Sequence, residues 1–133
     1  MNDIGNFQGI RLKFMARTGC LGLGEDRERW GHQDLSCCLC MARYENLPHF
    51  LFLCHGLNKV RVKHYRFLEK RLTDKGKDYV WQQFMSASIV GKLGLFIGED
   101  AYVHGREIGN LFDSTCTSFL IDAWQERKQS SVN

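Results

Sequence analysis

Four residues with metal-binding side chains lie within one short stretch, 37–54, and their spacing is that of a small metal site. Cys37 and Cys40 are separated by two residues, and His49 and Cys54 follow after intervals of eight and four residues. Thiolate sulfur and imidazole nitrogen bind zinc with tetrahedral geometry in structural sites, and a tight turn brings the first two thiolates to one ion. The pattern therefore predicts a structural zinc site with Cys37, Cys40, His49 and Cys54 as ligands.

Two neighbouring residues leave alternatives to this ligand set. Cys38 adjoins Cys37, but only one residue separates Cys38 from Cys40, which is closer than the usual chelating turn and favours Cys37. His55 directly follows Cys54 and is an alternative ligand in its place. Four protein ligands leave no coordination position for a catalytic water, and no catalytic motif is found elsewhere, so we expect a structural site and no enzymatic activity.

The segment that follows the zinc site is expected to be a basic helix. Apolar residues recur between 56 and 75 with a period near 3.6, and seven Lys or Arg residues stand against two acidic ones. Lysine and arginine side chains on the exposed side of such a helix can bind nucleic-acid phosphates. The alternative is that these side chains are only hydrated and bind no nucleic acid. The predicted nucleic-acid-binding residues are Lys59, Arg61, Lys63, Arg66, Lys70 and Arg71.

The fold class predicted for the whole chain is mainly α, with a small zinc knuckle packed against a bundle of about four to five helices. The first helix should carry its apolar side at Phe7, Ile10 and Phe14, widened by Leu12 and Met15. Residues 91–97 suit either a short helix or an extended segment, because their glycines weaken both. In chain order we expect a helix (7–18), a connector (19–36), the zinc knuckle (37–54), a helical C-terminal part (56–127) and a frayed tail (128–133).

Length and composition are those of one globular domain. The chain has 133 residues, 44% of them hydrophobic and 25% charged, and a net charge of +3 that permits nucleic-acid binding without requiring it. The N-terminus lacks the pattern of a signal peptide, and no apolar run is long enough for a membrane helix. We therefore expect no membrane partner and an intracellular protein, in the nucleus or the cytoplasm, whose six cysteines are ligands or buried thiols rather than disulfides.

Characteristic residues precede the metal-binding pattern and form its C-terminal part. Arg17-Thr18-Gly19 precedes it, the segment from His49 to Cys54 reads His-Phe-Leu-Phe-Leu-Cys, and Arg61 follows on the next helix. With these flanks, the chain from about Ile10 to Tyr65 resembles the zinc-binding segment downstream of the reverse transcriptase domain in LINE-type (non-LTR) retrotransposon polyproteins. The resemblance implies metal binding through the four residues named above and nucleic-acid contact that supports target-primed reverse transcription.

The chain also departs from a complete retroelement. It has no Tyr-x-Asp-Asp polymerase box, and its only proline, Pro48, excludes the Pro-Asp…Lys core of the associated nucleases. The resemblance therefore implies no catalytic activity for this chain. We expect a zinc-stabilised module that binds RNA or single-stranded or duplex DNA. The alternative is a zinc-stitched protein-interaction or scaffold domain, a co-opted or remnant retroelement fragment whose C-terminal helices bind a protein partner.

Overall fold

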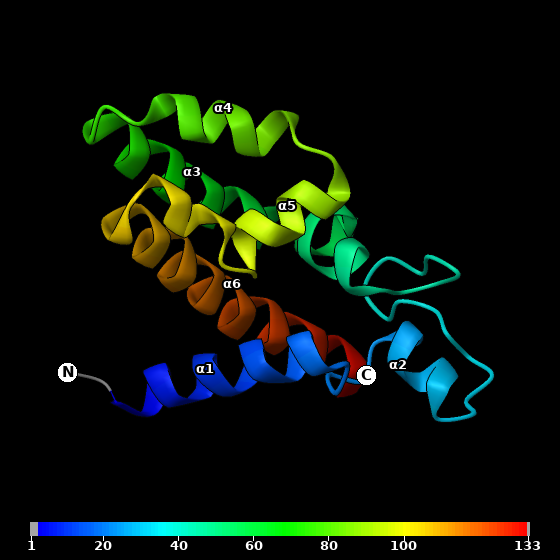
Figure 1. Ribbon diagram of the computed structural model, residues 1–133. Coiled ribbons are helices and arrows are strands. Elements are labelled where there is room, and N and C mark those ends of the chain that lie inside the picture. Colours follow the sequence, from blue (N-terminus) through cyan, green and yellow to red (C-terminus); the bar gives the residue numbers. More distant parts are fainter. Residues whose placement is uncertain (1–2, 133) are drawn as a thin grey trace.

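A computed structural model describes residues 3–132 of the chain and the side chains of residues 7–129 (Figure 1). The described residues are mainly α-helical and contain no strand, which confirms the predicted fold class. The α-helices are α1 (Asp3–Thr18), α2 (Gly24–Arg29), α3 (Asn58–Asp74), α4 (Asp78–Ser86), α5 (Ile89–Phe96) and α6 (Arg106–Val132). Three shorter helical segments are η1 (His49–Leu53), η2 (His55–Leu57) and η3 (Asp100–His104).

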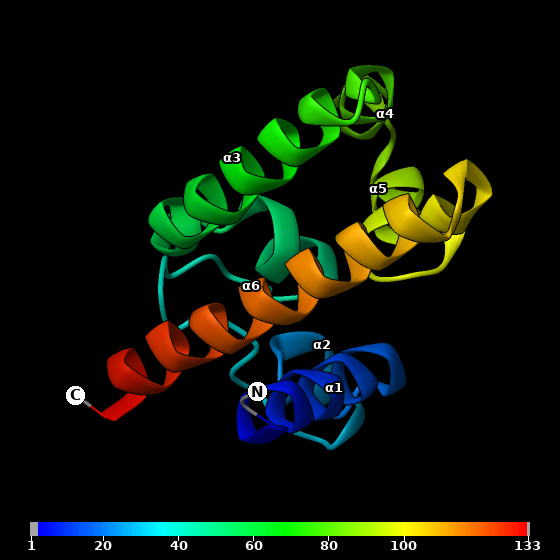
Figure 2. The same cartoon turned by 90° about the vertical axis from the view of Figure 1, so that its left-hand side faces the viewer.

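Helix α6 is the central element of the bundle. It lies between α3 on one side and α1 on the other, and it also packs against α5 and η3 (Figure 2). Its buried residues recur at intervals of three and four, so that a continuous apolar side faces the neighbouring helices. Within residues 3–132, no helix combines the length and the apolar character needed to cross a membrane.

The aromatic residues of the knuckle are part of the helical core. Phe50 contacts Phe119 of α6 with ring centroids 6.4 Å apart, and Phe52 contacts Phe84 and Phe96 at 6.2 and 5.9 Å. These rings meet edge to face, an arrangement that stabilises aromatic pairs beyond the effect of burial alone. The metal-site segment and the bundle therefore share one core.

The predicted apolar side of α1 was wrong at Phe7, Ile10 and Phe14, whereas Leu12 is buried as predicted. The helix faces α6 with Gly9, Leu12 and Ala16, which are buried. A Cβ atom at Gly9 would collide with the Thr117 side chain, so the two helices approach more closely than bulky residues permit. Small residues thus select the packed side of α1, and the larger apolar residues are left in solvent. These exposed residues are Phe7, Ile10 and Phe14.

Two other segments, 91–97 and 128–132, are largely helical in the structure. The ambiguous stretch 91–97 falls largely within helix α5, which begins where the Ser88 hydroxyl accepts a hydrogen bond from the Gly91 backbone N–H at 3.2 Å. Residues 128–132, predicted to fray, continue α6 as far as Val132, and residue 133 lies outside the described part. A bidentate contact of Arg127 with a buried carboxylate holds this end of α6 near the knuckle.

Candidate metal centre

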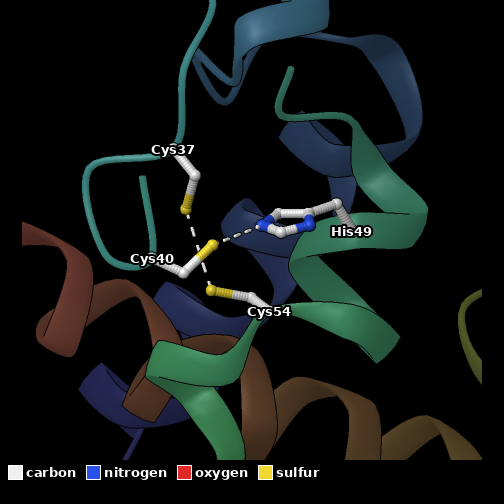
Figure 3. A group of neighbouring side chains, drawn as sticks. All are labelled: Cys37, Cys40, His49 and Cys54. Atoms are coloured by element: carbon white, nitrogen blue, oxygen red, sulfur yellow. Dashed lines mark hydrogen bonds between the residues drawn. The ribbon is translucent and has the colours of Figure 1, made fainter. Parts of the chain in front are cut away.

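The four predicted ligand side chains converge on one point (Figure 3). Their ligand atoms all lie within 4.8 Å of one another, with 3.7 Å between the sulfurs of Cys37 and Cys54 and 3.3 Å between Cys40 Sγ and His49 Nε2. A zinc tetrahedron with Zn–S of about 2.3 Å and Zn–N of about 2.0–2.1 Å has edges of about 3.8 Å between sulfurs and about 3.5 Å between sulfur and nitrogen. The separations of 3.7 and 3.3 Å are close to these edges, so the group can hold a metal ion.

A tight loop supplies the first two ligands. The Cys37 carbonyl accepts a hydrogen bond from the Met41 N–H at 3.0 Å, and the Cys37 N–H donates to the Ala42 carbonyl at 2.9 Å. Met41 has a φ of 64°, in the left-handed region that non-glycine residues seldom adopt, and this conformation reverses the chain after Cys40. The two-residue spacing thus folds both cysteine side chains to the same side of the loop.

A short π-helical turn, η1, presents the other two ligands. The Cys54 N–H donates to the His49 carbonyl at 2.8 Å, a bond that spans five residues instead of the four of an α-helix. Because the turn contains one extra residue, positions five apart come to the same side of the chain. The start of this turn is held by the Asn46 side-chain oxygen, which accepts from the His49 N–H at 2.9 Å. The four-residue interval between His49 and Cys54 is thereby explained.

Arg61 holds this turn through hydrogen bonds to its carbonyls. It was predicted to lie on the exposed side of α3 and to bind nucleic acid there. Its side chain is buried and donates to the carbonyls of Leu51 and Cys54, both at 3.1 Å, and to Asn58 Oδ1 at 2.8 Å. Burial lowers the pKa of this guanidinium. The predicted exposure of Arg61 was wrong, because this residue lies one helical turn into α3 on the side that faces the Leu51 and Cys54 carbonyls, to which it donates hydrogen bonds.

A buried carboxylate, Glu45, ties the knuckle loop to both ends of the chain. It accepts two hydrogen bonds from Arg127, Nε to Oε2 at 3.1 Å and Nη2 to Oε1 at 2.8 Å. It also accepts from the Gly24 N–H at 3.3 Å and from Arg27 Nη2 at 3.5 Å. Burial alone would lower the pKa of Arg127, but the bonds and charge of Glu45 outweigh that effect and raise it.

Arg27 fastens the connector that leads into the site. Its guanidinium donates to the carbonyls of Gly22 at 3.1 Å, Asp34 at 2.6 Å and Ser36 at 2.9 Å. The segment just before Cys37 is therefore held in place by one side chain. The roles of Arg27, Glu45 and Arg127 were not predicted from the sequence, because their partners are distant in the chain and the three residues form no local motif.

The protein environment of the thiols favours their neutral form when no ion is bound. Burial raises the pKa of Cys37 to about 12 and also raises the pKa of Cys54, while burial lowers the pKa of His49. The imidazole is thus available as a neutral ligand, but the thiols must lose protons to bind a metal ion. Metal binding therefore releases protons, and metal affinity rises with pH.

The alternative ligands lie outside the group. Cys38 is exposed, with its sulfur 3.9 Å from the Arg127 carbonyl oxygen, and His55 is exposed at the start of η2. Neither belongs to the set of converging ligand atoms. The structure therefore selects Cys37 over Cys38 and Cys54 over His55.

Thiol labelling distinguishes these assignments. In the metal-loaded protein, N-ethylmaleimide should modify the exposed Cys20 and Cys38, whereas the three ligand cysteines stay protected. Cys116 should also stay unmodified, because burial removes it from solvent and raises its pKa to about 12. Peptide mass spectrometry before and after treatment with a chelator measures the change. Labelling of Cys37 with protection of Cys38 would reverse the ligand assignment.

The remaining predicted nucleic-acid-binding residues are exposed on α3. Lys59, Lys63, Arg66 and Lys70 are spaced four, three and four residues apart, so they line one side of the helix; we call this set the basic stripe. Within it, Lys63 forms an ion pair with Asp122 of α6 at 3.1 Å. The sixth predicted residue, Arg71, lies beside the stripe with its guanidinium 5.7 Å from the centre of the Phe67 ring.

Comparisons with protein-family models, curated proteins and solved structures return no match to this chain, so its place among the non-LTR retrotransposon proteins stays a prediction from the sequence.

Proposed function

We propose that this chain is a zinc-stabilised nucleic-acid-binding module without catalytic activity of its own. The ion is assigned from the donor set: three thiolates and one imidazole are soft or borderline ligands that suit zinc and disfavour magnesium and calcium. All four positions of a tetrahedral ion are supplied by protein, as in structural zinc sites. Zinc thus holds the knuckle in place for a binding surface elsewhere.

The observation that carries the binding proposal is the basic stripe on α3. Its four cations extend over about 17 Å of helix, at a rise of about 1.5 Å per residue, which is enough to follow several successive phosphates. The helix starts only four residues after the ligand Cys54, and Arg61 joins its first turn to the carbonyls of the knuckle. The metal centre therefore sets the position and direction of the stripe.

Such a surface reads the phosphate backbone and not the base sequence. Binding should be tolerant of sequence and should weaken steeply with salt, because phosphate contacts release counterions. We infer from the resemblance of residues 10–65 that the nucleic acid is that of a non-LTR retroelement, inside the cell. RNA, single-stranded DNA and duplex DNA all present the phosphates that the stripe would bind.

Removing the stripe should abolish most of this binding. We expect the triple variant Lys59→Ala, Lys63→Ala, Lys70→Ala to bind nucleic acid about tenfold or more weakly at low salt. The slope of log K against log salt should fall by about 2–3, since each lysine contact contributes about 0.7–0.9. Fluorescence polarisation with labelled 20-nucleotide RNA, single-stranded DNA and duplex DNA over a salt series measures both quantities.

A control variant should lose the same charge elsewhere. Arg11, Arg43 and Arg106 are exposed and lie on other elements, so their replacement by alanine removes three cations without touching the stripe. Equal losses of affinity in the two triple variants would show that net charge, not the stripe, governs binding. Absence of binding by the unaltered protein at low salt would refute the proposed function.

A further inference from the structure

A second surface, which shares only Arg66 with the basic stripe, lies between α3 and α4. These helices pack side by side and antiparallel, with α5 at the end of α4 (Figure 1). A groove of about 380 Å³ runs between them, and residues of η1 and α5 also line it. Its floor is aromatic: the Tyr65 ring meets the rings of Trp81 and Phe84 edge to face, with centroids 5.8 and 5.6 Å apart.

The walls of the groove include exposed apolar side chains. Val62 of α3 and Met85 of α4 line it from opposite helices and are 45% and 46% exposed. Isolated exposed apolar residues are common, but here two of them flank a hollow with an aromatic floor. A methionine wall adapts its shape to apolar side chains of different sizes, as at peptide-binding surfaces.

The charge around the groove is positive. Three cations line it, Arg61, Arg66 and Lys92, against one carboxylate, Glu69. Among residues 7–129, none of these cations takes part in an ion pair. Arg61 donates only to carbonyl and amide oxygens, and its Nη2 atom is buried with no hydrogen-bond partner in the described part of the chain. The lining of the groove therefore carries a net positive charge.

We propose that this groove binds an acidic amphipathic peptide segment of a partner protein. Apolar side chains of the segment contact the partly exposed Tyr65 ring between Val62 and Met85. Aspartate or glutamate residues beside them face Arg66 and Lys92 at the rim. This arrangement joins an apolar anchor to charge complementarity, the combination that gives a peptide both affinity and orientation.

The groove is less suited to a nucleic-acid base. Base binding by stacking needs an aromatic face that is open to solvent. Trp81 is only 8% exposed and Phe84 is fully buried, and both rings already pack against other rings. The stripe and the groove therefore take different partners, although Arg66 borders both.

The test uses the full zinc-loaded chain and two synthetic peptides. The first is a fluorescein-labelled 16-residue peptide with Leu and Phe at helical positions i, i+3, i+4 and i+7 and Asp or Glu at the others. The second has Lys or Arg in place of every acidic residue. Fluorescence polarisation should show that the acidic peptide binds at least tenfold more tightly than the basic one. Equal binding of the two peptides, or no binding of either, overturns the proposal.

Substitutions at Lys92 and Met85 test whether the peptide binds in the groove. Lys92→Glu should weaken acidic-peptide binding at least tenfold, whereas Lys92→Arg should retain it. Met85→Glu should weaken it similarly, and thermal melting monitored by circular dichroism checks that each variant is folded. Because Lys92 lies at the rim, its exchange keeps the test decisive even where Met85→Glu does not fold. Unchanged binding by Lys92→Glu overturns the proposal.

The outcome is separable from that of the nucleic-acid proposal. The triple variant Lys59→Ala, Lys63→Ala, Lys70→Ala should bind the acidic peptide as the unaltered protein does. An unlabelled 20-nucleotide oligothymidine should not displace the peptide. Displacement by the oligonucleotide, together with weaker oligonucleotide binding by Lys92→Glu, would assign the groove to nucleic acid and overturn the peptide proposal.

Discussion

Removing the bound metal should unfold the region around residues 37–54 and destabilise the whole helical core. Two of the ligand sulfurs, on Cys37 and Cys54, are buried, and the aromatic residues of η1 pack directly on α5 and α6. Structural zinc contributes about 10–16 kcal/mol to the folding of small zinc modules. A domain of this size has a total stability of only about 5–15 kcal/mol, so loss of the ion is comparable with the stability of the whole domain.

The measurement combines metal analysis with unfolding. Protein purified without chelator should contain one zinc ion per chain. Chelation should cause loss of helical circular dichroism and of the cooperative thermal transition, and addition of zinc should restore both. A chain that is free of zinc after such a purification and melts cooperatively would contradict the assignment of the metal centre.

Cysteine variants should separate the ligands from the other thiols. Cys54→Ser should lose zinc and behave like the chelated protein, because the serine hydroxyl is a poor zinc ligand in a fully buried position. Cys20→Ser is the matched control, since Cys20 is exposed and distant from the converging ligand atoms. It should keep its zinc and its thermal transition unchanged.

The second large effect is expected at Glu45. Its carboxylate is 0% exposed and receives the guanidinium of Arg127 through two hydrogen bonds. Glu45→Gln keeps the shape but leaves the guanidiniums of Arg27 and Arg127 without a counter-charge, and breaking a buried ion pair on one side costs about 3–5 kcal/mol. For a chain of this length the midpoint of thermal unfolding should fall by about 10–18 °C.

Two comparisons test whether the buried pairing causes this loss. Glu126→Gln removes an exposed carboxylate beside Arg127 and should change stability by less than about 0.5 kcal/mol. Arg127→Met should cost less in the Glu45→Gln background than in the unaltered protein, because the two side chains interact directly. Strictly additive losses would mean that the pair is not coupled.

The ligand set of the metal centre was readable from the sequence. Cys37 and Cys40 are close enough in the chain to meet through one turn, and so are His49 and Cys54, so local spacing carries the information. The helical segments were readable for the same reason, since a period near 3.6 depends only on neighbouring residues. The π-turn at η1 was not foreseen, although it is what aligns the second pair of ligands.

The sides of α1 and α3 that face the core were only partly predicted from the sequence. The sequence placed Phe7, Ile10 and Phe14 toward the core and Arg61 toward solvent, and both orientations are reversed in the structure. Each helix carries more than one plausible apolar side, and its neighbours choose between them. Gly9 and Ala16 let α1 approach α6 closely, while the carbonyls of Leu51 and Cys54 accept hydrogen bonds from Arg61 in the interior.

By itself the sequence indicated the candidate metal-binding group, with Cys38 and His55 as open alternatives, the mainly helical class and the basic character of α3, because each depends on residues close together in the chain. Only the tertiary structure decided which cations remain on the surface, that Glu45 joins the knuckle to Arg127, and that a cationic groove opens between α3 and α4. These features depend on contacts between residues as far as 82 positions apart, where no local spacing or periodicity reports on the pairing.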